Sequence, residues 1–156
     1  MQVNQPDTAP RPFDSRLFLR EDELDRGIGL LLAAHRRLQE ALNHVDSNVS
    51  QSERSVLLAI YAAPGRSVSD LRTEMGASTP TFARLLGALD EKGLIERRKS
   101  INDGRARTLW LSDAGMSECA PFLRAARETL SAAYRDAGAE AVGGARLVLD
   151  ALAAVR

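Results

Sequence analysis

Six cations crowd into the stretch from residue 92 to residue 107, where two acids, Glu96 and Asp103, oppose them. The stretch therefore carries a net charge of +4. Ammonium and guanidinium groups bind phosphate, and a small exposed ribbon with this charge is typical of a surface that binds a nucleic-acid backbone. A solvated charged turn is the alternative interpretation. The neighbouring segments favour the nucleic-acid-binding surface. The cations are Lys92, Arg97, Arg98, Lys99, Arg105 and Arg107.

This cationic stretch is predicted to form a β-hairpin. Segments 94–99 and 108–111 alternate apolar and polar residues, and Asn102-Asp103-Gly104 lies between them. An Asp-Gly pair in that position favours a tight turn, because glycine accepts a positive φ. We expect Arg105 to reach a narrow minor groove, whose negative potential attracts arginine. Asp103 is expected to pair with a neighbouring arginine and so stabilise the loop. Phosphate contacts are predicted for Arg97, Arg98, Lys99 and Arg107.

Three helix signals precede the hairpin. Ser50-Gln51-Ser52-Glu53 fits a capping box, and the helix that it opens stops at Pro64-Gly65. Ser67-Val68-Ser69-Asp70 resembles a second box and opens a short helix. After a turn at Gly76, Ser78 or Thr79 caps a third helix, in whose first turn Pro80 is tolerated because no backbone donor is needed there.

The third helix has two contrasting faces. Its apolar residues follow the i, i+3, i+4, i+7 spacing of a core face: Phe82, Leu85, Leu86 and Leu89. The order helix, short helix, turn, helix and basic hairpin predicts a winged helix-turn-helix, whose second helix enters the major groove of DNA by its N-terminal residues. Small and polar residues occupy that end and allow close approach to bases. The predicted DNA contacts of this helix are Ser78, Thr79, Thr81, Ala83 and Arg84.

Long apolar stripes flank the winged helix at both ends of the chain. Residues 21–45 carry one stripe, and residues 112–134 and 142–155 carry two more. A single winged helix cannot cover so much apolar surface, so we expect these helices to pair with a second copy in a homodimer. The fold class is mainly α with a small β-hairpin. We expect a disordered tail over 1–16, an N-terminal dimerisation helix over 17–48, the winged helix over 49–112 and C-terminal dimerisation helices over 113–156.

Two motifs in this region resemble the MarR family (multiple-antibiotic-resistance regulators) of bacterial winged-helix transcription factors. They are Asp103–Leu109 followed by Leu111-Ser112-Asp113-Ala114-Gly115, and the preceding run Leu89–Arg97. The resemblance covers roughly residues 20–155, as one domain. It implies an obligate homodimer on a pseudopalindromic operator and a small-molecule effector that releases it. Gly87, Gly104 and Pro121 depart from the family pattern.

In that family, effectors bind where the flanking helices meet the winged helix. Five residues are candidates here, and for each a purely structural role is the stronger alternative: His35, Arg36, Tyr61, Trp110 and Phe122.

Composition limits the class of protein that this chain can be. The 156 residues suffice for one domain, and 44% hydrophobic with 27% charged residues is ordinary for a soluble protein. Net charge is zero, although residues 51–113 hold ten Lys/Arg against eight Asp/Glu. With neither a signal peptide nor a membrane span recognisable, a cytoplasmic protein is expected.

The single cysteine, Cys119, is expected to be a buried packing residue. No catalytic or metal-binding constellation is recognisable, so neither an enzyme nor a cofactor is expected. A winged-helix module that docks a protein and has lost DNA binding is the alternative function.

Overall fold

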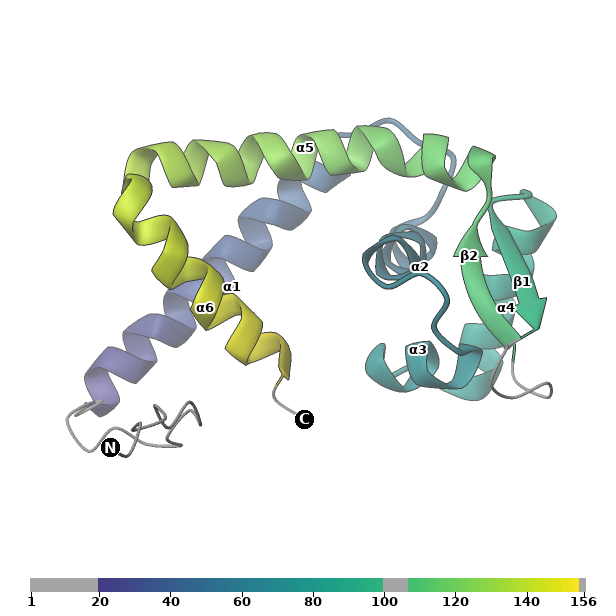
Figure 1. Ribbon diagram of the computed structural model, residues 1–156, viewed down its shortest axis with the longest axis horizontal. Coiled ribbons are helices and arrows are strands. Elements are labelled where there is room, and N and C mark those ends of the chain that lie inside the picture. The colour runs from purple at the N-terminus through teal and green to yellow at the C-terminus, as the bar shows by residue number, and fades with distance from the viewer. Residues whose placement is uncertain (1–19, 100–106, 155–156) are drawn as a thin grey trace, which may run out of the picture. The chain divides into compact units, whose positions relative to one another are not determined.

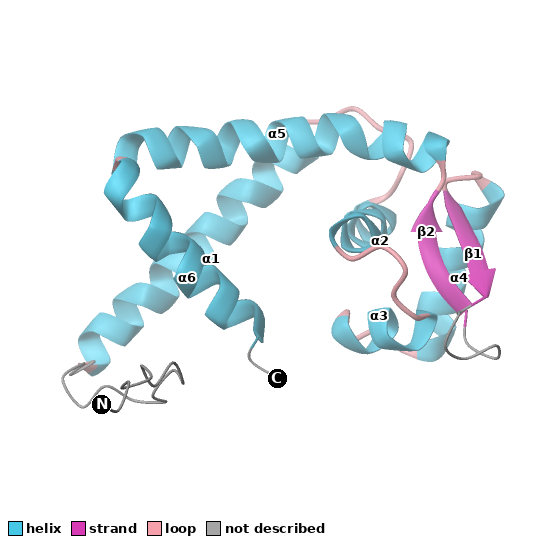
Figure 2. Cartoon of the chain, viewed as in Figure 1, coloured by secondary structure: helices cyan, strands magenta, loops and turns pink. Residues whose placement is uncertain are grey.

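The computed structural model describes residues 20–99 and 107–154, which form six helices and one antiparallel hairpin (Figures 1 and 2). This architecture confirms the predicted fold class. In chain order the elements are α1 (Glu21–Asn43), α2 (Gln51–Ala62), α3 (Val68–Glu74), α4 (Thr79–Glu91), β1 (Ile95–Lys99), β2 (Arg107–Leu111), α5 (Asp113–Ala137) and α6 (Ala139–Ala154).

The chain divides into two compact units, residues 1–37 and residues 38–156. The described part of the first unit is the beginning of α1, whose apolar residues are exposed. Leu30 and Leu32 are each 62% accessible, and His35 and Arg36 on the same stretch are also exposed. The second unit contains the last turns of α1 and all the other elements.

The hydrophobic core of the second unit lies within the winged helix. α2 and α4 contribute the apolar faces that the sequence spacing predicts, and α3, the hairpin and the start of α5 complete the core. Tyr61, for which a structural role was the stronger expectation, is half-buried. The core residues are Val56, Leu57, Ile60, Leu71, Phe82, Leu86, Leu89, Leu94, Ile95, Leu109 and Cys119.

Serine side chains fix where these helices begin. The Ser50–Glu53 capping box of α2 is complete in both directions. At α3 the Ser67 hydroxyl accepts from the Asp70 amide at 3.0 Å, but among the described contacts the Asp70 carboxylate makes no reciprocal bond. The second box is therefore only half formed, consistent with the aspartate side chain being one methylene shorter than glutamate. α4 and α5 are capped by Ser78 and Ser112.

Strand β2 has backbone partners on both of its edges. On one side it pairs with β1 in the register Ile95–Leu111, Arg97–Leu109 and Lys99–Arg107. On the other side Leu109 exchanges hydrogen bonds with the α2–α3 turn, accepting from the Gly65 amide at 2.9 Å and donating to the Arg66 carbonyl at 3.0 Å. The base of the hairpin is thus part of the helical core.

A buried arginine joins the end of α1 to α2. Arg54 is 6% exposed, and its guanidinium group donates to the Leu42 carbonyl at 2.9 Å and to the Asn43 side-chain oxygen at 2.7 Å. It also lies over the Phe122 ring of α5, 5.5 Å from the centroid. Carbonyls at a helix C-terminus lack partners within the helix, so Arg54 supplies a donor that α1 would otherwise miss.

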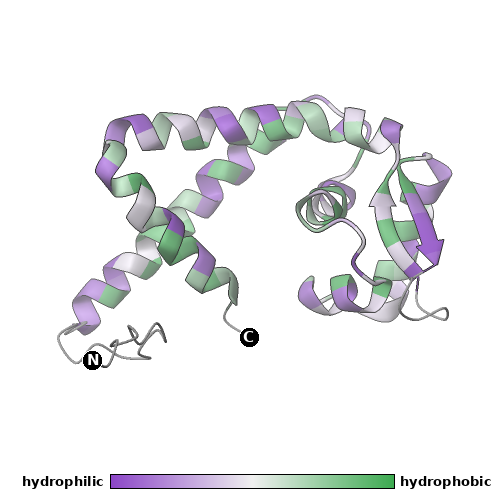
Figure 3. Cartoon of the chain, viewed as in Figure 1, coloured by the Kyte–Doolittle hydropathy of each residue, from purple (hydrophilic) through white to green (hydrophobic). Residues whose placement is uncertain are grey.

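The last two helices carry much uncovered apolar surface. α5 continues through Pro121 as one helix and ends at Gly138, whose φ of +83° favours glycine. No residue of α6 is buried, and Leu147 is 73% exposed. The hydropathy colouring shows several hydrophobic residues along α6 (Figure 3). Among the helices described, none combines the length and apolarity that crossing a bilayer requires.

Candidate nucleic-acid interface

The N-terminal end of α4 is exposed and held by its own cap. The Ser78 hydroxyl accepts from the Thr81 amide at 3.4 Å and lies 2.9 Å from the Thr81 hydroxyl. Thr79 and Pro80 begin the helix beside them. Ser78 satisfies the Thr81 amide and Pro80 has no N–H, so in this first turn the Thr79 amide is the one left to meet an anion.

The two faces of α4 separate as the sequence predicts. Phe82, Leu86 and Leu89 are at most 1% exposed and fix the helix on the core. Thr79, Thr81, Ala83 and Arg84 are exposed on the other side. Arg84 makes no hydrogen bond or ion pair with the residues described here. The predicted base-contacting residues are therefore accessible, and their contact with DNA stays a prediction.

Two of the wing arginines already have partners within the chain. The Arg97 guanidinium pairs with Asp90 of α4, with Nε 2.9 Å from Oδ2. Arg98 donates to the Glu96 carboxylate at 2.8 Å and lies 4.6 Å from the centre of the Trp110 ring. These contacts orient both guanidinium groups. Glu96 is already included in the sequence count of +4, whereas Asp90 lies outside residues 92–107 and offsets a further charge.

The other wing cations lie toward the tip. Lys99 and Arg107 are exposed, directly opposite one another at the end of the two strands. Neither forms an ion pair within the described ranges. Arg105 and Asp103 fall in 100–106, outside the residues that the structure describes, so their predicted roles are untested.

Between α3, α4 and the hairpin the surface is hollowed. The hollow has a volume of about 460 Å³ and is lined by residues of all three, including Phe82. The lining is largely apolar, with Arg72, Arg97 and Arg107 contributing to it. Of these, Arg97 is paired with Asp90 and Arg72 donates to the Ala77 carbonyl at 3.3 Å. Arg72 was not among the predicted site residues, because a single arginine in a short helix gives no sequence signal that it lies near the wing.

Comparison with known proteins identifies the chain. The sequence model of the MarR family matches residues 47–106, which run from before α2 to beyond β1. The HTH-type transcriptional regulator PetP of Rhodobacter capsulatus is 30% identical over 148 residues, covering 94% of this chain and 89% of PetP. The chain belongs to the MarR family. It is thus a member of a family of DNA-binding transcription regulators.

Solved structures share the MarR fold with this chain. NadR in complex with 4-hydroxyphenylacetate matches with a TM-score of 0.69 and 20% identity, covering 94% of this chain and all of NadR. A mutant of MarR from E. coli complexed with operator DNA matches with a TM-score of 0.56 and 21% identity, covering 83% of this chain and 92% of that one. These matches confirm the winged helix-turn-helix fold that the sequence predicts.

The residues proposed from the MarR resemblance as effector contacts have diverse surroundings. Tyr61 is half-buried, and its hydroxyl accepts from Arg127 of α5 at 3.4 Å. Trp110 is half-buried on the wing, and its indole N–H donates to Thr108 at 3.1 Å. Phe122 is 1% exposed, so ligand contact there would require the core to open. His35 and Arg36, in the first unit, are exposed. None of these roles is tested by the fold.

Proposed function

We propose that this MarR-family protein is a homodimeric, sequence-specific repressor whose binding to a pseudopalindromic operator is released by a small-molecule effector. One observation carries the proposal. The slim, exposed half of α4 that bears Thr79, Thr81 and Arg84 lies beside the arginine-lined hollow between α3, α4 and the wing. Such a helix can enter the major groove while the neighbouring cations neutralise phosphates.

Uncovered apolar surface supports the dimer. On α6, Leu147 is 73% and Val148 59% exposed, and on α1 Ile28 is 57% exposed. Surface of this kind, repeated along whole helices, is costly in water unless another protein surface covers it. A two-fold pair would also place two recognition helices for successive half-sites about 34 Å apart, one turn of DNA.

Release by an effector is supported by relatives. NadR was crystallised in complex with 4-hydroxyphenylacetate, a small aromatic acid. His35, Arg36, Tyr61, Trp110 and Phe122 remain our candidates for contacting a small molecule in this chain.

A winged helix that docks a protein is the second candidate function. Zero net charge and the pairing of Arg97 with Asp90 and of Arg98 with Glu96 favour it, because both weaken attraction to DNA. The exposed Arg84, Lys99 and Arg107 favour DNA.

Titration of labelled duplex from the region upstream of the gene, at two salt concentrations, separates the two. A regulator should bind that duplex in preference to a scrambled one, and its log affinity should fall steeply with log salt. Arg84→Ala should change base preference at one position by roughly 1–3 kcal/mol. Arg105→Ala should weaken binding to most sequences alike and reduce the salt slope by about one. Indifference to sequence and salt would support the docking module.

A further inference from the structure

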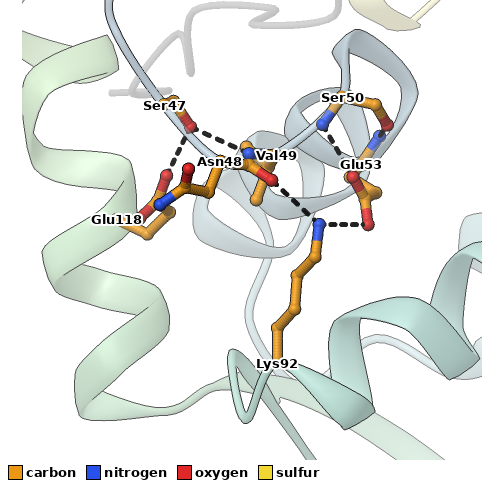
Figure 4. Close-up of polar contacts among 7 residues, drawn as sticks. All are labelled: Ser47, Asn48, Val49, Ser50, Glu53, Lys92 and Glu118. Carbon is orange, nitrogen blue, oxygen red and sulfur yellow. Dashed lines mark hydrogen bonds and ion pairs between the residues drawn. The ribbon is translucent and has the colours of Figure 1, made fainter.

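Lys92 follows the last turn of α4 and is the helix C-cap, and its side chain points toward Asn48 and Glu53 (Figure 4). Its ammonium group donates to the Asn48 carbonyl at 3.0 Å and to the Glu53 carboxylate at 2.8 Å. Although it belongs to the cationic stretch of the sequence, its charge is directed at the linker between α1 and α2 and at the start of α2.

The partner of Lys92 is a largely buried carboxylate. The Glu53 side chain is 8% exposed, and its other oxygen accepts from the Ser50 amide at 2.6 Å. Burial by itself raises the pKa of Glu53, but hydrogen bonds from Lys92 and Ser50 outweigh it, and the pKa is lowered. Glu53 is therefore ionised at neutral pH, with both oxygens committed.

The linker is also held at a second point. The Ser47 hydroxyl donates to the Glu118 carboxylate of α5 and accepts from the Val49 amide at 3.1 Å. The linker thus touches the first turns of α5 on one side and the end of α4 on the other. We call this set the linker clasp: Ser47, Asn48, Val49, Ser50, Glu53, Lys92 and Glu118 (Figure 4).

We propose that Lys92 is a positioning residue for DNA recognition, holding the far end of α4 on the linker clasp instead of contacting phosphate. The proposal rests on the DNA-binding function proposed above. α4 has 13 residues, a rod of about 20 Å at 1.5 Å per residue. Loosening its C-terminal end lets the rod tilt, which displaces Thr79 and Arg84 near the other end from the bases they would read.

Removing the charge of Lys92 and removing the charge of Glu53 should change DNA affinity in opposite directions if Lys92 only attracts DNA, and in the same direction if the pair positions α4. If Lys92 only added positive potential, Lys92→Met would weaken binding and Glu53→Gln, which removes a negative charge, would strengthen it. If the pair positions α4, both variants should weaken operator binding. The double variant should then be no weaker than either single one, because each has already broken the same contact.

The experiment measures affinity for the operator duplex and for a scrambled duplex, with circular dichroism confirming that each variant is folded. We expect Lys92→Met and Glu53→Gln each to lower operator affinity about five- to tenfold, to leave scrambled-duplex affinity unchanged and to leave the salt slope unchanged. Lys92→Arg should restore most of the affinity, since a guanidinium can also donate to Glu53. Lys99→Met is the matched control. It removes a cation from the wing and should reduce the salt slope by about one on both duplexes.

Opposite effects of Glu53→Gln and Lys92→Met, or wild-type operator affinity in both, would overturn the proposal. So would a fall in salt slope by one in Lys92→Met, which would make Lys92 a phosphate contact. If Lys92→Met does not fold, Glu53→Gln decides, because glutamine still offers an oxygen to the Ser50 amide. Failure of the wild-type protein to bind any duplex is a different result and would overturn the proposed function itself.

Discussion

Gly115, in the first turn of α5, lies against the main-chain carbonyl of Leu94 at the start of the wing. A β-carbon at position 115 would stand 2.0 Å from that oxygen and 3.4 Å from a Leu111 methyl group. Two further bonds fix the same junction, since Ser112 donates from its amide to the Leu94 carbonyl at 3.1 Å and from its hydroxyl to the Gly93 carbonyl. The glycine of the Leu-Ser-Asp-Ala-Gly motif is thus explained by close backbone approach.

Gly115→Ala should therefore destabilise the fold. The methyl group meets backbone, which cannot rotate away as a side chain would, so we expect a loss of about 3 kcal/mol or more in the free energy of unfolding. Gly87→Ala is the matched control, because a β-carbon there has nothing within 4 Å. Removing a mid-helix glycine should stabilise α4 by roughly 0.5–1 kcal/mol. Urea denaturation measures both, and equal stabilities would refute the close contact.

Acid should weaken the fold partly through Glu53. Its pKa is lowered in the folded protein from the ordinary value of 4.5, because the hydrogen bonds from Lys92 and Ser50 outweigh burial. Its contribution to stability is therefore present above about pH 4.5 and is lost as the pH falls through the lowered pKa. Unfolding free energies of wild type and Glu53→Gln, measured from pH 6 to pH 3, should converge with acid. A constant difference across that range would contradict the assignment.

Cys119 should be chemically inert in the folded protein. Burial, with the charge of Glu118 adding to it, raises the pKa of this thiol from 9.0 to about 11. Two pKa units make the reactive thiolate about 100-fold scarcer at pH 8. A thiol reagent such as DTNB should react slowly with native protein and rapidly in guanidinium chloride. Fast reaction in the native state would show that this part of the core opens.

Asp90 should restrain Arg97. Asp90→Asn removes the carboxylate that holds the guanidinium and leaves Arg97 available to phosphate. We expect tighter binding to operator and scrambled duplex alike, with a salt slope steeper by about one. Glu91→Gln removes the same charge from the adjacent, exposed position and serves as control. The free energy of unfolding should change by less than about 1 kcal/mol, because the side chains of Asp90 and Arg97 are each more than a third exposed. Equal slopes in the two variants would show that Arg97 was never restrained.

Local signals were sufficient to predict the helix-turn-helix and the hairpin. Ser50 caps the helix that the sequence assigns to it, and Ser78, one of the two residues considered, caps α4. Phe82, Leu86 and Leu89 form the buried face that their spacing indicates. Capping and periodicity act within one or two turns of chain, so a single sequence contains them in full.

Pairings between distant segments could not be predicted. Lys92 meets Glu53 across 39 positions, and Arg54 reaches the Leu42 carbonyl at the end of a different helix. Nothing in composition or spacing distinguishes these cations from Arg84, which is exposed. Which charges face solvent is decided by how the elements pack. The count over residues 92–107 therefore included Lys92, whose charge faces Glu53, and left out Asp90, which pairs with Arg97.

α5 runs unbroken for 25 residues from its rigid junction with the wing to Gly138. At 1.5 Å per residue this makes a lever of about 37 Å, so a swing of about 5° at the junction moves the opposite end by about 3 Å. That displacement is close to the rise of one base pair, about 3.4 Å. In the two-fold dimer proposed above, a junction that does not bend would therefore fix the separation of the two recognition helices to within about one base pair.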